Sequence, residues 1–102
     1  MHSSITDISK ALATEVSVSD DALTVQLSDG RSIAAPLAWY PRLSHATATE
    51  RASWRLIAGG RGIHWPELDE DVSIENLLLG QPSGESQSSF QHWLEKRAAE
   101  KR

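Results

Sequence analysis

The side chains best able to do chemistry crowd the segment between residues 64 and 71. They are one histidine and four carboxylates: His64, Glu67, Asp69, Glu70 and Asp71. Carboxylate oxygens are the ligands that Ca²⁺ and Mg²⁺ prefer, so a metal- or small-ligand-binding protein is one interpretation. The spacing departs from an EF-hand loop, because neither the glycine at the sixth place of that loop nor its terminal glutamate falls in register.

A structural interpretation of this acidic segment is favoured over the metal site. Acidic residues ahead of a helix are stabilised by the positive end of the helix dipole, and Ser73 is a good N-cap. The segment therefore predicts a tight turn from a strand that ends near Trp65-Pro66 into a short helix. We expect no metal ligand and no cofactor here, and an exposed His64 that points away from the face shared by Ile63 and Trp65.

Signatures of catalysis are missing from the sequence. Without cysteine there is no disulfide, thiolate zinc site or cysteine nucleophile. The "GGRG" at residues 59–62 precedes a strand pattern rather than the helix that a phosphate site requires, and no G-x-S-x-G elbow occurs. None of the four histidines has zinc-site spacing. We expect no catalytic residue and a protein that is not an enzyme.

Charge is distributed unevenly along the chain. Residues 1–85 hold six Lys/Arg and twelve Asp/Glu, a net charge of −6, whereas residues 86–102 hold four and two, a net charge of +2. An acidic body repels phosphate backbones, so nucleic-acid binding is expected, if at all, only weakly through Lys96, Arg97, Lys101 and Arg102. No signal-like start and no apolar run of roughly 18 residues is present, so a cytoplasmic protein without membrane contact is expected.

Alternating hydrophobic residues predict an antiparallel meander in the first half of the chain. The apolar positions are Val16 and Val18, then Leu23, Val25 and Leu27, then Ile33 and Ala35. Asp29-Gly30 is a strong hairpin signal. Two prolines at 36 and 41 predict that the third strand ends near residues 35–38, followed by a corner. A second hairpin, or a strand with a bulge, is expected within residues 54–65.

Capping patterns predict short helices. Thr47 and Glu50 have the spacing of a capping box, which places a helix at about 47–53. Ser73 and Gly80 bound a short helix that carries Ile74, Leu77 and Leu78. The expected fold class is thus α+β, with a small antiparallel sheet (meander plus hairpin), short helices and a C-terminal amphipathic helix. The expected organisation is an arm at 1–14, a domain at 15–80, a linker at 81–89 and a helix at 90–102.

Three of the four tryptophans, Trp39, Trp54 and Trp65, are expected in the core. The fourth, Trp93, shares one stripe of the tail helix with Phe90 and Leu94. Such a stripe must pack on its own domain or on another molecule, and both alternatives stay open. Phe90, Trp93 and Leu94 are accordingly the candidate protein-interaction residues, with a protein partner or a homodimer as the expected assembly.

The run "PRLSHATATERASWRLIAGGRGIHWPELDEDVSIENLLLG", with the "DG" hairpin before it, resembles the bacterial domain-of-unknown-function family numbered 2442 over about residues 14–80. The resemblance implies a small fold of antiparallel strands with one or two short helices, and it implies no established activity. Some relatives lie beside or are fused to DNA-binding or toxin–antitoxin-like partners, which implies a regulatory, antitoxin-like interaction module. The segment 81–102 is not part of the shared domain.

Overall fold

The structure, a computed structural model, describes residues 11–100 of the 102-residue chain. Its first sheet is an antiparallel meander of β1 (Ala13–Val18), β2 (Ala22–Leu27) and β3 (Ser32–Pro36). Leu23, Val25 and Leu27 are buried while Gln26 is exposed, the alternation expected of a half-buried strand. Gly30 takes a positive φ of 92° in the turn between β2 and β3, which confirms the Asp-Gly hairpin.

The second sheet is also a three-stranded antiparallel meander, with β4 (Arg55–Ile57), β5 (Gly62–Trp65) and β6 (Glu70–Ser73) in that order. The prediction of a turn leading directly into a helix was wrong at this point. The turn spans only residues 66–69, and Glu70–Ser73 form a strand that pairs with β5. Buried and exposed positions alternate along β6 as in other strands. One buried position is Glu70, so the two-residue hydrophobic alternation that predicts a strand is not visible in the sequence.

Helical segments connect the two sheets: η1 (Leu37–Trp39), α2 (Pro41–His45) and α3 (Ala48–Ala52). The predicted capping box of α3 is confirmed. The Thr47 hydroxyl accepts the Glu50 N–H at 3.1 Å, and the Glu50 carboxylate accepts the Thr47 N–H at 2.9 Å. The two bonds satisfy donors that a helix start otherwise leaves unpaired.

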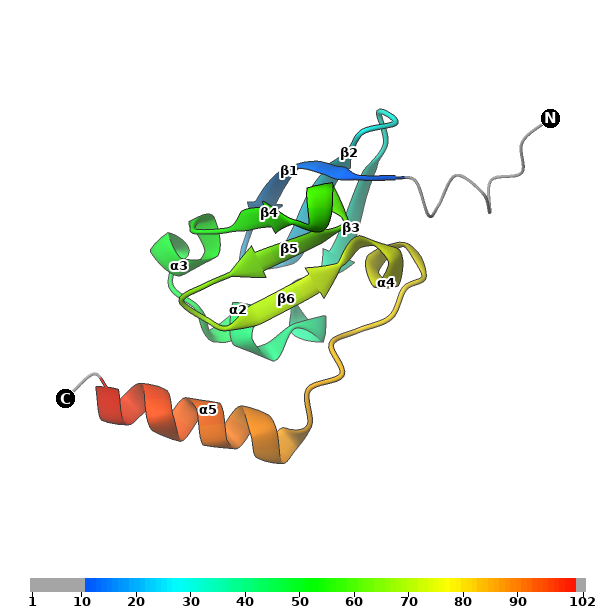
Figure 1. Ribbon diagram of the computed structural model, residues 1–102. Helices are drawn as coiled ribbons and strands as arrows, with labels where there is room; N and C mark the ends of the chain where they lie inside the picture. Colours follow the sequence, from blue (N-terminus) through cyan, green and yellow to red (C-terminus); the bar gives the residue numbers. More distant parts are fainter. Residues whose placement is uncertain (1–10, 101–102) are drawn as a thin grey trace.

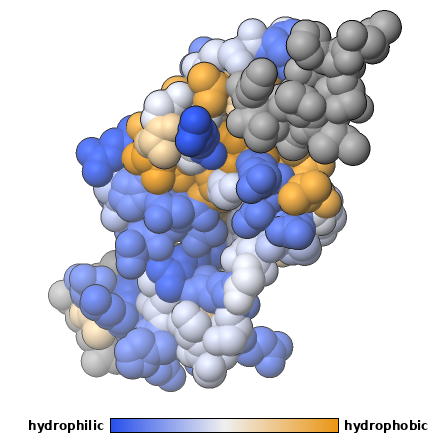
Figure 2. Space-filling model, turned by 45° about the vertical axis from the view of Figure 1, so that its right-hand side comes forward, coloured by the Kyte–Doolittle hydropathy of each residue, from blue (hydrophilic) through white to orange (hydrophobic). Residues whose placement is uncertain are grey.

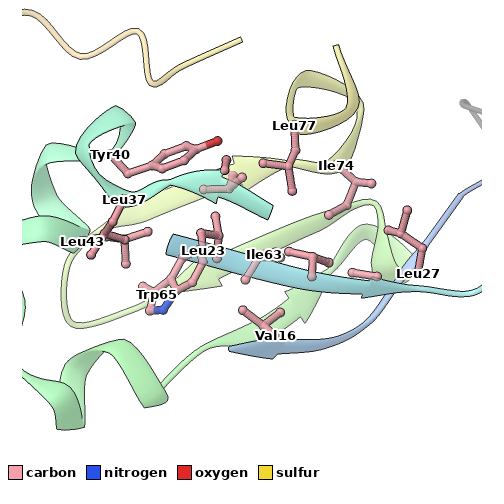
Figure 3. Close-up of a cluster of buried hydrophobic side chains, with 14 of the residues drawn as sticks. Val16, Leu23, Leu27, Leu37, Tyr40, Leu43, Ile63, Trp65, Ile74 and Leu77 are labelled. Carbon is pink, nitrogen blue, oxygen red and sulfur yellow. The ribbon is translucent and has the colours of Figure 1, made fainter. Parts of the chain in front are cut away.

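One hydrophobic core joins the two sheets, which lie one behind the other in Figure 1. Figure 3 shows side chains of both sheets gathered with Leu37, Tyr40 and Leu43 of the connecting segment. Trp65 is fully buried, and its indole N–H donates to the Arg51 carbonyl at 3.0 Å. Trp39 and Trp54 are partly buried against the same core, as expected from the sequence.

Two helices complete the chain, α4 (Ile74–Leu78) and α5 (Gln87–Glu100). Ser73 caps α4 by accepting the Asn76 N–H, which confirms the prediction. Helix α5 lies beside the rest of the molecule, joined to it by an irregular segment (Figure 1). It begins three residues earlier than its expected start at residue 90. At the other end, β1 begins at Ala13, inside the segment expected to be an arm; residues 1–10 of that arm lie outside the described part.

The architecture confirms the predicted α+β fold class, with small antiparallel sheets, short helices and a C-terminal helix. We call residues 11–85 the body.

Candidate functional site

Trp93 is the centre of the contact between α5 and the body. Two guanidinium groups lie over its ring, with the Arg42 carbon 5.2 Å and the Arg97 carbon 5.0 Å from the ring centroid. Phe90 stacks on the same indole with centroids 5.7 Å apart, and His45 meets Phe90 edge-on at 5.1 Å. Cation–π contacts of this kind contribute about 0.5–2 kcal/mol each, depending on their exposure to water. The predicted aromatic stripe therefore docks on its own body.

An ion pair between Arg97 of α5 and Glu50 of α3 lies beside the tryptophan. Both Nη atoms of Arg97 donate to the Glu50 carboxylate, one of them at 2.8 Å. The two side chains are only 16% and 14% exposed, so water screens the pair weakly. The Arg97 guanidinium lowers the pKa of Glu50 to about 2. Glu50 thus serves two elements at once, because the same carboxylate closes the capping box of α3.

A second charged contact holds the segment just before α5. Arg42 of α2 donates from Nε and Nη2 to Glu85, the shortest bond being 2.6 Å, and from Nη1 to the Leu68 carbonyl at 2.9 Å. The Arg42 guanidinium holds the pKa of Glu85 below its ordinary value. A bidentate guanidinium–carboxylate pair fixes direction as well as distance. Arg42 therefore ties the start of α5 to the turn between β5 and β6.

A groove of about 620 Å³ remains between α5 and that turn. On the body side it is bordered by Arg42 and by residues 67–69 of the turn. The helix side presents Ser88, Ser89, His92, Trp93, Lys96, Arg97 and Glu100. The walls carry both signs of charge, with Glu67 and Asp69 across from Lys96. Helix α5 therefore contacts the body through a few side chains, and the groove separates the rest of the helix from the turn.

Glu70 is the one buried charged residue in the described part of the chain, at 9% exposure. Burial, reinforced by the nearby Glu85 carboxylate, raises the pKa of Glu70 to about 7, although Arg42 opposes the shift. The hydroxyl of Tyr40, whose pKa Glu70 also helps to raise, is buried without a hydrogen-bond partner. A carboxyl with such a pKa can exchange protons near neutrality. Glu70 does not border the groove, however, so it faces no space for a substrate there.

The acidic segment does not converge as a metal site would require. Glu70 points into the protein and Asp71 outward, as neighbours in a strand must. His64 lies opposite Asp71 in the pairing of β5 with β6, and its Nδ1 contacts that carboxylate. Glu67 and Asp69 border the groove instead. Within residues 11–100, no three histidine, aspartate or glutamate side chains come together as a metal site.

The remaining candidate residues are dispersed. Leu94 is partly buried but lies outside the core cluster that Trp93 joins. In the basic tail, Arg97 is occupied by Glu50 and Lys96 borders the groove, while Lys101 and Arg102 lie outside the described residues.

Sequence reasoning missed three residues of this contact, Arg42, Glu50 and Glu85. Glu50 was recognised only as part of a capping box. The partners in the two ion pairs are 43 and 47 residues apart in the chain, so no local spacing relates them. The one sequence signal for such pairing is the opposite net charge of the body and the tail.

In the part of the chain that the structure describes, no helix is both long enough and apolar enough to cross a bilayer. Two solved structures share the fold. One is a protein of unknown function from Rhodospirillum rubrum, at 23% identity with a TM-score of 0.63, aligned over 78% of this chain and 96% of its own. The other is an uncharacterized protein from Chromobacterium violaceum, at 19% identity with a TM-score of 0.65, aligned over 87% of this chain and 83% of its own.

No curated protein matches the sequence. The family model described as "Protein of unknown function (DUF2442)" matches residues 13–83, which include all six strands and α4 but stop before α5. This match confirms the resemblance found in the sequence. The chain belongs to the DUF2442 family of proteins of unknown function.

Proposed function

We propose that the protein is a non-enzymatic bacterial interaction module of the cytoplasm, with a regulatory, antitoxin-like role, and that α5 is its contact element. The observation that carries the proposal is the way α5 is attached. None of its residues is buried. Its contacts to the body are the Arg97–Glu50 ion pair, a hydrogen bond from the Ser89 hydroxyl to Glu85 and the stack around Trp93.

Attachment of this kind suits reversible docking. A helix that belongs permanently to a core buries an apolar stripe, and each large side chain so buried contributes about 1.5–3 kcal/mol. Helix α5 leaves Phe90, Trp93 and Leu94 partly exposed. Its ion pair with Glu50 can be exchanged for an equivalent pair with a partner at little net cost, because both states keep the charges paired. Aromatic and arginine side chains are also the residues that dominate protein interfaces.

A catalytic role has less support in the geometry. The one carboxyl with a pKa near neutrality is Glu70, and it lies away from the groove. A general acid or base must come within hydrogen-bond reach of its substrate. The groove itself is bordered by Arg42 and Arg97, whose guanidinium groups are already paired with carboxylates.

Site-specific photo-crosslinking in cells tests the proposal. A photoreactive phenylalanine derivative at Phe90 should capture one protein partner, because the aromatic face is then part of the interface. The matched control places the same group at Glu95, an exposed position of α5. Capture from position 90 should disappear when Trp93 is replaced by alanine. Equal capture from positions 90 and 95, or none from either, would contradict an interaction through this face.

A further inference from the structure

We propose that the body surface covered by α5 is a docking face for a basic amphipathic helix of a partner protein, which binds there in exchange for α5. This goes beyond the proposed function: there the released α5 contacts a partner, whereas here the body surface that α5 leaves binds a basic helix. We call this surface the acidic face and define it by five of the body residues that contact α5 or border the groove beside it: Arg42, His45, Glu50, Glu67 and Asp69.

Charge complementarity selects a basic occupant. The body carries a net charge of −6 and the tail +2. Three of the five residues that define the acidic face are carboxylates, and the buried Glu70 lies behind them, close enough to interact with Arg42. Figure 2 shows hydrophilic residues on the outer surface where the body and the tail helix meet. An acidic helix would be repelled by this face.

The contacts of α5 indicate what the face recognises. Trp93 and Arg97 are four residues apart, so they project from the same side of a helix. The ring lies under the Arg42 guanidinium while Arg97 reaches Glu50. A partner helix that presents an aromatic residue, with an arginine one turn later, would make both contacts.

The fit of α5 is incomplete, which leaves room for a better ligand. The groove of about 620 Å³ persists while α5 is docked. Ser89 and His92 of α5 border it with small or polar side chains. A helix with leucine at these two positions would fill part of the groove and bury more apolar surface. Helix α5 therefore covers the acidic face but leaves part of the groove unfilled.

The connection to the body allows exchange. Residues 79–82 and 84 are exposed, and neither Gly80 nor Gly84 has a neighbour within 4 Å of an added Cβ. Between the two glycines the Ser83 N–H donates to the Trp39 carbonyl at 3.1 Å, a single bond that exchange would have to leave or break. A short flexible connection gives an attached segment an effective concentration on the order of 1 mM. For a separate helix that binds the face with a dissociation constant of about 100 μM, the ratio of the α5-occupied face to the free face is about ten. Releasing α5 should then raise the apparent affinity of the face for the separate helix about tenfold.

The experiment uses the full-length chain and a fluorescently labelled peptide of residues 86–102. Binding is measured for the wild type, for the double variant Trp93→Ala/Arg97→Ala, and for that double variant with Glu50→Gln added. The double variant weakens α5 but leaves the acidic face intact, so it should bind the peptide about tenfold more tightly than the wild type. Glutamine keeps the capping-box hydrogen bond, because it also serves at that position, and removes the charge. It should reverse the gain.

Two further peptides sharpen the test. A peptide with Ser89→Leu and His92→Leu should bind more tightly than the parent, because it fills the groove. A scrambled peptide of the same composition should bind at least tenfold more weakly than the parent. Equal binding of the scrambled peptide, or no saturable binding to the double variant at about 1 mM peptide, would overturn the proposal.

Light scattering examines a second copy of this chain as the occupant. A wild-type dimer that exchanges α5 between copies would assign the face to that copy and overturn the proposal, whereas a monomer supports it. These measurements use purified protein and a defined peptide, so they can fail while cellular crosslinking succeeds. The reverse outcome would remove the proposed function but keep the docking face.

Discussion

Replacing Glu70 by glutamine should stabilise the protein at alkaline pH and change its stability far less in mild acid. Burial raises the pKa of this carboxyl from an ordinary 4.5 to about 7 in the folded protein. Between these two values the folded state holds a proton that the unfolded state has lost. Folding then takes up a proton, so the free energy of unfolding falls as pH rises through this window.

The magnitude follows from the two pKa values of Glu70. Each pKa unit corresponds to 1.36 kcal/mol, so the ionised carboxyl costs the folded state up to about 3 kcal/mol above pH 8. Glutamine resembles the protonated acid in shape and carries no charge. The variant should therefore gain about 2–3 kcal/mol over the wild type at pH 8 relative to pH 5. The fixed cost of burying an amide is the same at both pH values and cancels.

Urea unfolding of the wild type and the variant at pH 5 and pH 8 measures this difference. For a chain of this size, a gain of 2 kcal/mol at pH 8 also raises the melting temperature by about 10 °C. Glu67→Gln is the matched control, since it removes an exposed carboxylate from the neighbouring turn. The reasoning is refuted if Glu70→Gln shifts stability equally at both pH values, or if Glu67→Gln gives the same pH dependence.

Three further substitutions test the parts of the fold that support the site, each by urea unfolding at pH 7. Gly60 has a φ of 96°, and a Cβ added to it would lie 3.1 Å from the Ala13 carbonyl oxygen, so Gly60→Ala should lower the free energy of unfolding by about 2–3 kcal/mol. Gly59 has open space around it, so Gly59→Ala should lower it by only about 1 kcal/mol. Equal losses for the two variants would contradict the close contact between Gly60 and β1. Trp65→Phe should cost about 2–4 kcal/mol, because it leaves a void and an unpaired Arg51 carbonyl, and a loss under 1 would contradict the fully buried position. Thr47→Ala should cost about 1 kcal/mol through the lost cap, against no significant change for the exposed Thr49→Ala.

Individual strands, turns and helix starts could be predicted from the sequence, because each depends mainly on residues close together in the chain. The alternation at Leu23, Val25 and Leu27 predicts a strand, since successive side chains of a strand face opposite sides. Asp29-Gly30 predicts its turn, and Thr47 with Glu50 predicts the start of α3. These signals extend over a few residues and do not depend on the remainder of the fold.

Strand β6 shows where such reasoning fails. Glu70 occupies an inward position that a hydrophobic residue normally fills, so the acidic segment resembles a turn. Its strand conformation comes from pairing with β5 and from Val72 in the core. Tertiary pairing overrides local preference here, because a strand is stabilised mainly by its cross-strand and packing neighbours.

The contact around Trp93 divides in the same way. The sequence by itself determined that residues 90–94 form an amphipathic stripe and that the tail is basic on an acidic body. Only the tertiary structure decided that Arg42 packs on Trp93 and that Glu50 pairs with Arg97, because folding brings together residues more than 40 positions apart. Helical periodicity is a property of consecutive residues, whereas the partner of a charge depends on where the chain returns in space.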